Sequence, residues 1–310
     1  MYKISVVICT YNRDKFLDIC LESLFKQNLP SYDFEIIVVD NNSTDNTKEV
    51  FDTKKLENPS FEMRYIEEKT QGLSYARNTG WQAANSPYVY YLDDDGKASP
   101  QLLGEFLRLF SLKENIAACG GKIIVEYDPE KPDWLPHFFE RFYGDYSRGE
   151  EVVECEYVPG GNSTWSVDFL KESGGFATEL GRVGQDGAGC EESLLNARAV
   201  QMGYTLMYSP DALMYHYAGP SRLNIKWLFQ RMRGQGKSST KLILMNSDNK
   251  KRVAIHCVKV DVKLLLKYFF IWKYTEKNLK QELVSRASLS IEKIQRIKDF
   301  SKYLAIFWKA

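Results

Sequence analysis

The sequence predicts an α/β fold: a mostly parallel β-sheet with helices on both faces. Three observations support this prediction. Residues 4–9 and 34–39 are unbroken runs dominated by β-branched residues, which is typical of strands buried on both faces. Helix-like segments separate the predicted strands, and a strand–helix–strand order gives parallel pairs. The 310 residues, 44% hydrophobic and 26% charged, are enough for a large core.

The further elements follow in chain order. Residues 14–27 carry apolar side chains three and four positions apart, which indicates a helix. Capping residues at 42–45 predict a second helix that runs toward residue 56. We expect a strand at 61–66, a helix at 74–84, a strand at 88–92 and later helices at 191–202 and 225–245. Residues 119–159, rich in aromatics and prolines, are expected to form a partly flexible lobe.

Polar side chains follow the ends of three predicted strands. In parallel sheets, ligands bind beyond the carboxyl ends of the strands, so these residues should share one rim. They are Thr10, Tyr11, Asn12 and Arg13 after the first strand, Asp40 and Asn42 after the second, and Asp93, Asp94 and Asp95 after the fourth.

The acidic run at 93–95 is the first candidate site. Three adjacent carboxylates repel one another unless a cation compensates them. In an extended segment Asp93 and Asp95 project to the same face. Their oxygen ligands suit Mg²⁺ or Mn²⁺, which would bridge them to a diphosphate. The alternative is a solvated acidic turn, which Gly96 and Pro100 nearby would favour.

Four segments give the chain a family resemblance. In order they read ISVVICTYNR (4–13), EIIVVDNNSTD (35–45), GLSYARNTG (72–80) and YLDDD (91–95). Over about residues 3–240 the chain resembles the family 2 glycosyltransferases. The resemblance implies a glycosyltransferase A fold, which is a single Rossmann-like nucleotide-binding domain with a mixed central sheet. It also implies inverting transfer from a nucleotide sugar.

The resemblance also implies roles for the rim residues. Thr10, Tyr11 and Asn12 would line the nucleotide pocket, and Asp40 would bind the base, often uracil. Arg77 matches a position near the nucleotide, and Asp93 and Asp95 match the acidic motif that contacts ribose and metal. Arg13, Asn42 and Asp94 complete the expected nucleotide-sugar-binding set. Alternatively, Asp40 simply caps a helix and Arg77 forms a surface ion pair.

Two further segments carry the expected acceptor chemistry. The family has an acidic pair, usually Glu-Asp, whose second member deprotonates the acceptor hydroxyl. Glu191 and Glu192 occupy this position, so Glu192 is the expected base and Glu191 the fallback. Helix capping by these carboxylates is the alternative. Gly160, Gly161 and Asn162 resemble the family's loop at the donor sugar, where Asn162 would hold sugar hydroxyls; a plain turn is the alternative.

His216 is the third expected metal ligand. Enzymes of the family that the chain resembles can carry a histidine at the corresponding position, next to the metal or the diphosphate. With Asp93 and Asp95 it would hold Mn²⁺ or Mg²⁺. A lone histidine is more often structural, and that alternative stays open.

The C-terminal segment differs in charge from the rest. Residues 250–310 hold 15 Lys and Arg against 5 Asp and Glu, which leaves 26 against 36 elsewhere. We therefore predict a catalytic domain at 1–245, with a nucleotide-binding half at 1–100 and an acceptor-binding half at 101–245. A basic amphipathic helical tail follows at 246–310. Ile291, Ile294, Ile297, Leu304 and Trp308 can share one of its faces.

This tail suits either an anionic membrane surface or packing against the domain. No recognition motif for nucleic acid accompanies its charge. The scattered cysteines and the strand-like start predict a cytoplasmic protein without a signal peptide, with the inner face of the cell membrane as the alternative location.

The sequence therefore predicts a metal-dependent inverting glycosyltransferase. Its donor would be a nucleotide sugar, with a UDP-sugar favoured, and its acceptor a carbohydrate or a lipid-linked glycan of cell-surface polysaccharide or glycolipid assembly. Two alternatives remain, a sugar-phosphate nucleotidyltransferase and a non-catalytic nucleotide-sugar-binding protein. The first usually has a glycine-rich N-terminal loop, which residues 10–13 lack.

Overall fold

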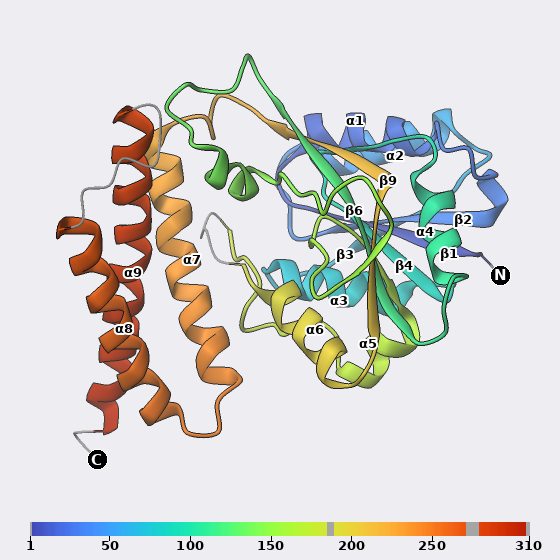
Figure 1. Ribbon diagram of the computed structural model, residues 1–310. Coiled ribbons are helices and arrows are strands. Elements are labelled where there is room, and N and C mark those ends of the chain that lie inside the picture. Colours follow the sequence, from blue (N-terminus) through green and yellow to red (C-terminus); the bar gives the residue numbers. More distant parts are fainter. Residues whose placement is uncertain (1, 185–188, 271–278, 308–310) are drawn as a thin grey trace. The chain divides into compact units, whose positions relative to one another are not determined.

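The computed structural model describes residues 2–184, 189–270 and 279–307. The chain forms two compact units, which we call the sheet unit and the helical unit (Figure 1). The sheet unit comprises Met1–Glu126, Tyr143–Gly184 and Glu191–Tyr217, and the helical unit comprises Tyr127–Phe142, Gln185–Cys190 and Ala218–Ala310.

The secondary structure of the described residues follows the predicted alternation. The strands are β1 (Ile4–Thr10), β2 (Phe34–Asp40), β3 (Glu62–Glu67), β4 (Tyr88–Leu92), β5 (Gly96–Ala98), β6 (Ile116–Tyr127), β7 (Val153–Cys155), β8 (Asn162–Ser166) and β9 (Thr205–Ala218). The α-helices are α1 (Asp14–Leu24), α2 (Thr47–Glu57), α3 (Leu73–Ala83), α4 (Leu102–Phe110), α5 (Val167–Ser173), α6 (Glu191–Gln201), α7 (Ile225–Met245), α8 (Lys250–Phe270) and α9 (Leu279–Phe307). Two short 3₁₀ helices are η1 (Ser31–Asp33) and η2 (His137–Tyr143).

One mixed sheet runs through the sheet unit. Its strand order is β3-β2-β1-β4-β8-β6-β9-β5, and β7 also pairs with β9. The first four strands of this order are parallel, whereas β8 runs antiparallel to both β4 and β6. The parallel part places the carboxyl ends of β1, β2 and β4 along one edge, as predicted.

Helices cover both faces of this sheet, as Figure 1 shows, with α1 and α2 on one side and α3, α5 and α6 on the other. Side chains of a strand alternate between faces, and the two cores divide accordingly. Ile36 and Val38 belong to one core, while Ile37 and Val39 belong to the other. All residues of β2 are buried, which explains the apolar run Ile36–Val39 within it.

Helix α3 lies unusually close to the sheet at Gly80. A Cβ atom at this position would stand 2.4 Å from Val7 Cγ1, so a larger side chain would push the helix away from β1. This contact fixes α3, and with it Arg77 one turn earlier, over the centre of the parallel strands.

The expected lobe at 119–159 is more regular than the sequence predicted. Its first nine residues belong to the long strand β6. Gly120 and Gly121 are needed inside the sheet. A Cβ at Gly121 would lie 1.8 Å from the Ala212 carbonyl oxygen, and one at Gly120 would lie 2.8 Å from Val158.

The helical unit contains the basic C-terminal segment. Helix α9 packs against both α7 and α8. At Gly236 of α7 a Cβ would lie only 2.7 Å from the Glu292 carbonyl oxygen, so the two backbones approach closely. Asp261 of α8 is buried and lies 2.9 Å from Arg296 Nε of α9, so part of the positive charge is neutralised internally.

Four residues of α9 are buried among those described, namely Glu282, Val284, Ser288 and Phe300. On the face expected to be apolar, Ile291, Ile297 and Leu304 are half-buried, whereas Ile294 is 43% exposed. Trp308 lies outside the described residues. Within the described ranges no helix is both long enough and apolar enough to span a bilayer. All six cysteines are free thiols.

Candidate functional site

The predicted rim exists at the carboxyl edge of the parallel strands. Thr10 and Asp40 are partners in the β1–β2 register, at the last position of each strand. Asp93 follows β4, the other neighbour of β1. The Asp93 amide donates to the Gly161 carbonyl oxygen at 3.2 Å, which ties the acidic run to the start of β8.

Asp93, Asp95 and His216 form one cluster. Each offers a ligand atom, and these atoms lie within 4.8 Å of one another. His216 comes from β9, where it pairs with Gly96 of β5, so its place is set by the sheet. Its Nε2 lies 3.1 Å from Asp95 Oδ1. The sequence prediction that these three side chains meet is confirmed.

The cluster is chemically suited to a divalent metal. Two carboxylates and one imidazole form a donor set that Mn²⁺ accepts, whereas Mg²⁺ prefers oxygen donors. Asp95 and His216 are each only 7% exposed, and burial of the Asp95 carboxylate is costly unless a cation or a basic side chain compensates its charge. Gly144 leaves room for the imidazole, because a Cβ there would lie 2.9 Å from His216 Nδ1.

Arg13 lies inside the acidic cluster. Its Nη1 is 3.1 Å from Asp94 Oδ1 and 2.5 Å from Asp95 Oδ2. The Thr10 hydroxyl donates to Asp94 Oδ2 at 2.9 Å. Burial raises the pKa of Asp94 to about 6, while Arg13 acts in the opposite direction. Thr10 and Arg13, expected at the nucleotide, thus hold the acidic run in place in this structure.

Asp40 has partners on both carboxylate oxygens. Oδ1 accepts the Ser43 amide at 3.0 Å, and Oδ2 accepts the Tyr65 hydroxyl at 2.7 Å. Tyr65 comes from β3, and no local pattern in the sequence pointed to it. Each carboxylate oxygen has a second lone pair, so Asp40 can still accept a hydrogen bond from a base.

The loops after β1 and β2 are joined to each other. The Asn12 amide donates to the Ser43 hydroxyl at 2.9 Å, and the Asn12 side-chain oxygen accepts the Thr44 amide at 2.7 Å. Asn12 and Asn42 both have positive φ, 53° and 74°, a conformation that Asn tolerates better than most residues. Tyr11 is exposed beside them.

Arg77 is buried and connects two parts of the site. Its Nη1 lies 2.6 Å from Glu191 Oε1, and its Nη2 lies 3.8 Å from Asp93 Oδ1. Nη2 also donates to the Gly160 carbonyl oxygen at 3.2 Å. The alternative of a surface ion pair is therefore excluded. Arg77 joins the acidic cluster to the beginning of α6.

Glu192 is the second residue of α6, directly after Glu191. The Tyr157 hydroxyl donates to Glu192 Oε1 at 3.1 Å. Burial raises the pKa of Glu192 to about 7, the charge of Glu191 adds to this effect, and Arg77 opposes it. A carboxyl group with this pKa exchanges protons near neutral pH, as a general base must.

Asn162 differs from its expected role at a sugar. Its side chain is completely buried. Its amide donates to the carbonyl oxygens of Lys122 and Ala212 at 3.0 and 2.9 Å, and its side-chain oxygen accepts the Tyr90 hydroxyl at 3.1 Å. Both amide protons are engaged within the sheet, so Asn162 fastens strands together and its side chain is not available to a sugar.

Gly161, its neighbour, is the residue of this loop that shapes the site. A Cβ there would lie 2.1 Å from Asp93 Oδ2. Only glycine lets the loop approach the acidic cluster this closely. The sequence showed that the loop consists of small residues. It did not show that the nearby Asp93 carboxylate is what requires a glycine at this position.

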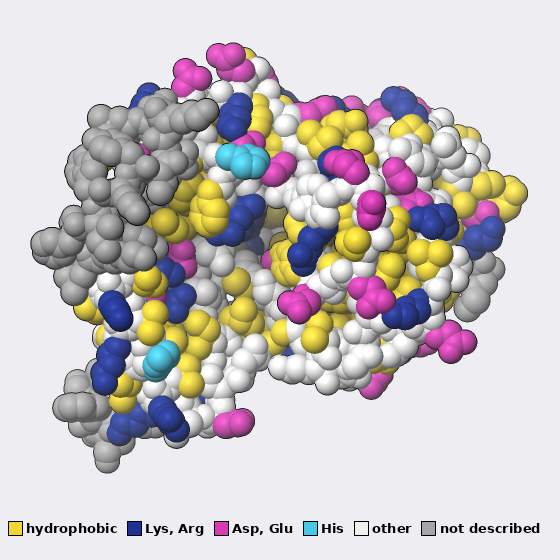
Figure 2. Space-filling model, in the orientation of Figure 1, with side chains coloured by type: hydrophobic (Ala, Val, Ile, Leu, Met, Phe, Trp, Pro, Cys, Tyr) yellow, Lys and Arg dark blue, Asp and Glu magenta, His cyan; other side chains and the backbone are white. Residues whose placement is uncertain are grey.

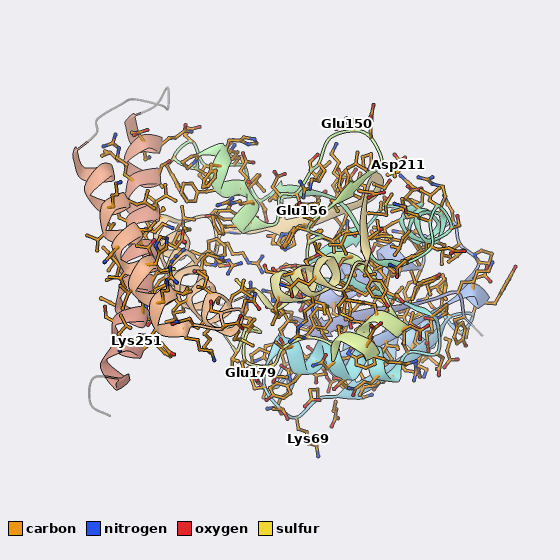
Figure 3. All side chains as sticks on the ribbon, turned by 60° about the horizontal axis from the view of Figure 1, so that its bottom comes forward. Lys69, Glu150, Glu156, Glu179, Asp211 and Lys251 are labelled. Carbon is orange, nitrogen blue, oxygen red and sulfur yellow. The ribbon has the colours of Figure 1, made fainter. Side chains whose placement is uncertain are left out.

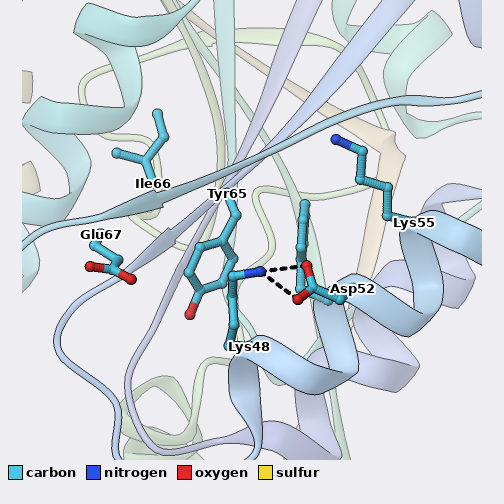
Figure 4. A pocket seen from close by; sticks show the side chains of 7 residues that line it. Lys48, Asp52, Lys55, Tyr65, Ile66 and Glu67 are labelled. Atoms are coloured by element: carbon cyan, nitrogen blue, oxygen red, sulfur yellow. Dashed lines mark hydrogen bonds and ion pairs between the residues drawn. The ribbon is translucent and has the colours of Figure 1, made fainter.

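A separate pocket of about 590 Å³ lies between α2 and β3 (Figure 4). Lys48, Asp52, Tyr65 and Glu67 are among its lining residues, and none of the predicted site residues is. Two of its lining residues adjoin the rim: the Tyr65 hydroxyl reaches Asp40, and Glu67 is the partner of Asp40 in the β2–β3 register. The chemistry described above lies elsewhere.

The chain is similar to known transferases. The model of "Glycosyl transferase family 2" matches residues 5–172, more than half of the chain. Glucosyl-dolichyl phosphate glucuronosyltransferase of Haloferax volcanii is 26% identical over 248 residues, 78% of each protein. Validoxylamine A glucosyltransferase of Streptomyces hygroscopicus subsp. limoneus is 34% identical over 135 residues, which are 42% of this chain but only 28% of that protein.

Solved structures agree on the fold. Mannosyltransferase PcManGT from Pyrobaculum calidifontis, in complex with GDP-Man and Mn²⁺, gives a TM-score of 0.63 at 18% identity, over 96% of this chain and 88% of that one. TarS 1–349 of S. aureus in complex with UDP gives 0.52 at 18% identity, over 97% and 91%. The fold is the glycosyltransferase A fold, as the sequence predicted. With its ordered motifs and this fold, the chain belongs to glycosyl transferase family 2.

Proposed function

We propose that this glycosyltransferase moves a sugar, with inversion, from a metal-bound nucleoside diphosphate sugar to an acceptor hydroxyl. One observation carries the proposal. Asp93 belongs both to the cluster with Asp95 and His216 and, through Arg77, to the acidic pair at the start of α6. A cation site and a candidate base are therefore held by one continuous set of side chains.

The donor side of the site handles negative charge. Asp93, Asp95 and His216 would hold Mn²⁺ or Mg²⁺, which on binding neutralises the diphosphate as it becomes the leaving group. Of the two, Mn²⁺ better suits the mixed donor set. The Arg77 guanidinium lies 3.8 Å from the Asp93 carboxylate and offsets part of its charge. Asp40, at the end of β2, is the proposed acceptor for the imide N–H of uracil.

On the acceptor side, the site must remove a proton from the attacking hydroxyl. Glu192 takes the proton of the acceptor hydroxyl, and the freed oxygen forms a bond to the anomeric carbon. The bond between that carbon and the diphosphate oxygen breaks, so the configuration inverts. Glu191 is held by Arg77 at 2.6 Å, which makes it the positioning member of the pair and leaves Glu192 as the base.

The proposed acceptor is a carbohydrate or a lipid-linked glycan. This rests on the names of relatives, which include a glucosyl-dolichyl phosphate glucuronosyltransferase and a teichoic acid poly(glycerol phosphate) polymerase. Family membership removes the sugar-phosphate nucleotidyltransferase, and the paired Glu191 and Glu192 argue against a protein that only binds nucleotide sugars.

A thermal-shift screen of UDP-, GDP- and dTDP-sugars with Mn²⁺ tests the donor assignment. We expect stabilisation by UDP-sugars that disappears in EDTA. The selected UDP-sugar is then incubated with wild type and Glu192→Gln, and UDP release is measured. Equal UDP release from both proteins would remove Glu192 from the mechanism, and stabilisation by GDP-sugars alone would overturn the uracil assignment.

We also propose that the helical unit contacts an anionic membrane surface, which would bring the enzyme to a lipid-linked acceptor at the inner face of the membrane. Helix α8 exposes Lys251, Arg252, Lys259 and Lys263, with Ile255, Val260 and Val262 exposed among them. Figure 2 shows Lys, Arg and hydrophobic side chains mixed over this helix, and Lys251 is marked in Figure 3. Basic and apolar groups together suit anionic lipid headgroups.

Flotation with vesicles tests this contact. Full-length protein is mixed with phosphatidylglycerol vesicles or with neutral phosphatidylcholine vesicles. We expect flotation only with the anionic lipid, and its loss in the triple variant Lys251→Glu, Lys259→Glu, Lys263→Glu. The matched control changes Lys26, Lys55 and Lys69, exposed on the sheet unit, to Glu. Equal flotation of both variants would contradict a role for α8.

A further inference from the structure

Tyr157 contacts the proposed base, Glu192, although the two residues are far apart in the sequence. Tyr157 follows β7, whereas Glu192 lies in the first turn of α6. The phenol donates to Glu192 Oε1 at 3.1 Å. The neighbouring Glu156 is exposed on the sheet unit (Figure 3), so the chain turns the tyrosine inward at this point.

The segment that carries Tyr157 is fastened to α6. Asn196, one turn after Glu192, accepts the Val158 amide at 2.9 Å and donates to the Val158 carbonyl oxygen at 3.0 Å. The same Asn196 amide donates to the Glu192 carbonyl oxygen at 2.8 Å. One buried side chain therefore fixes both the residue after Tyr157 and the backbone of Glu192, so the distance between phenol and carboxylate is set by the fold.

Tyr146 holds the other side of this segment. Its hydroxyl donates to the Tyr157 carbonyl oxygen at 2.7 Å, so it supports the backbone and leaves the phenol of Tyr157 to Glu192. Burial, strengthened by the charge of Glu192, raises the pKa of Tyr157 well above its ordinary value. The phenol therefore remains a proton donor at any pH used for assay.

Three side chains act on Glu192 among the described residues. Glu191 repels its charge, Arg77 attracts it, and Tyr157 donates a hydrogen bond to it. Arg77 lies 2.6 Å from Glu191, so its charge is largely matched there. Tyr157 is then the direct neutral partner of the Glu192 carboxylate, and a hydrogen bond to an ionised carboxylate is stronger than one between neutral groups.

We propose that Tyr157 is the positioning residue for Glu192: its hydroxyl holds Oε1 and stabilises the ionised base, so that Oε2 receives the proton of the acceptor. This inference rests on the proposed function, because it assigns a task to the proposed base. It adds a residue, supplied by the segment before β8, that sets the pH range in which the enzyme works.

The test compares Tyr157→Phe with Tyr146→Phe. Hydrolysis of the UDP-sugar selected by the thermal-shift screen is followed as UDP release from pH 5.5 to 9.5 with Mn²⁺. In Tyr157→Phe we expect kcat at pH 7 to fall about 10-fold and the acidic limb to move up by roughly one pH unit. The KM for the donor should stay unchanged, and much of kcat should return at pH 9. Tyr146→Phe loses the hydrogen bonds with the Tyr157 carbonyl oxygen and with Arg148 but leaves the Tyr157 phenol in place, so it should keep the wild-type profile.

A second variant keeps the phenol in place. Replacing Tyr157 by 3-fluorotyrosine makes the phenol a stronger donor and should move the acidic limb to lower pH. The inference would be overturned if the acidic limb of the pH profile stays unchanged in both Tyr157 variants. It would also be overturned if Tyr146→Phe shifts this limb as much as Tyr157→Phe does. The variant Glu192→Gln distinguishes a failure of the proposed function from a failure of the positioning role of Tyr157. If Glu192→Gln keeps full activity, the proposed function fails; if it is inactive while the Tyr157 profiles match wild type, only the positioning role fails.

Discussion

Arg77 and Glu191 form a buried ion pair, with 2.6 Å between Nη1 and Oε1. Both side chains are almost completely inaccessible, and Arg77 also approaches Asp93 at 3.8 Å. The pair connects α3 to α6 across the edge of the parallel strands. It fixes the acidic pair of α6 relative to the acidic run after β4, so it supports both halves of the proposed reaction.

Removing one partner of this pair should be much worse than removing both. Arg77→Gln leaves the buried Glu191 carboxylate without its cation, and we expect a loss of about 3–5 kcal/mol in the free energy of unfolding. Arg77→Gln with Glu191→Gln should recover most of that loss. Urea unfolding of the four proteins of this cycle measures the coupling. A double variant no more stable than Arg77→Gln alone would show that the pair contributes nothing specific.

Metal binding should depend on Asp95 and His216 but much less on Asp94. Asp94 is held by Thr10 and Arg13 and is not a member of the metal cluster. We expect Mn²⁺ to raise the Tm of wild type and of Asp94→Asn, and to leave Asp95→Asn and His216→Ala unchanged. If His216→Ala keeps the wild-type shift, the histidine is structural, which was the alternative drawn from the sequence.

Glu192→Gln should be inactive, and its stability relative to wild type should increase as the pH rises. The folded pKa of Glu192 is raised to about 7, above its ordinary value, so its carboxyl favours the fold at low pH and this benefit disappears as pH increases through 7. Gln cannot ionise, so the variant should melt roughly 2–4 °C above wild type at pH 8 and near it at pH 4.5. Calorimetry at both pH values checks this, and a higher melting temperature for wild type at pH 8 would refute it.

The pH dependence of wild-type turnover should also report the ionisation of Glu192. Because the base must be ionised, kcat should rise with pH and level off above about pH 7, where Glu192 loses its proton. The measurement is a profile of UDP release at saturating donor. A profile that is flat from pH 5.5 to 8 would point to another base.

Gly161→Ala should damage the metal site without a large change in the core. Its new Cβ would lie 2.1 Å from Asp93 Oδ2, so the loop or the carboxylate must move. We expect a weaker Mn²⁺-induced rise in Tm. Gly104→Ala in α4 is the matched control, because nothing lies within 4 Å of its Cβ and it should stabilise the protein by about 0.5–1 kcal/mol. An unchanged response to Mn²⁺ in Gly161→Ala would show that Asp93 is not a ligand.

Local patterns predicted the parallel part of the fold well. The apolar run of β2 and the spacing of Leu17, Cys20, Leu21 and Leu24 in α1 correspond to buried faces in the structure. Strand β6 was not predicted, and it contains Gly120 and Gly121 within the sheet. Their reason is the close approach of Val158 and Ala212, which come from distant parts of the chain.

The same limit applies to the site. Asp93 and Asp95 were recognisable because they follow a strand and alternate along it, and His216 because of its place in the family pattern. Tyr65 and Tyr157 act on Asp40 and Glu192 across long stretches of chain, and a tyrosine alone gives no signal of its partner. Asn162 sat in a recognisable loop, but only its hydrogen bonds reveal that it faces the sheet.

Pulsed electron paramagnetic resonance of bound Mn²⁺ with UDP tests the central claim most directly. If Asp93, Asp95 and His216 hold a cation that bridges to the diphosphate, the spectra contain coupling to one imidazole nitrogen and to phosphorus, and His216→Ala removes only the nitrogen signal. Spectra of wild type without phosphorus coupling, or a nitrogen coupling that persists in His216→Ala, would contradict the account.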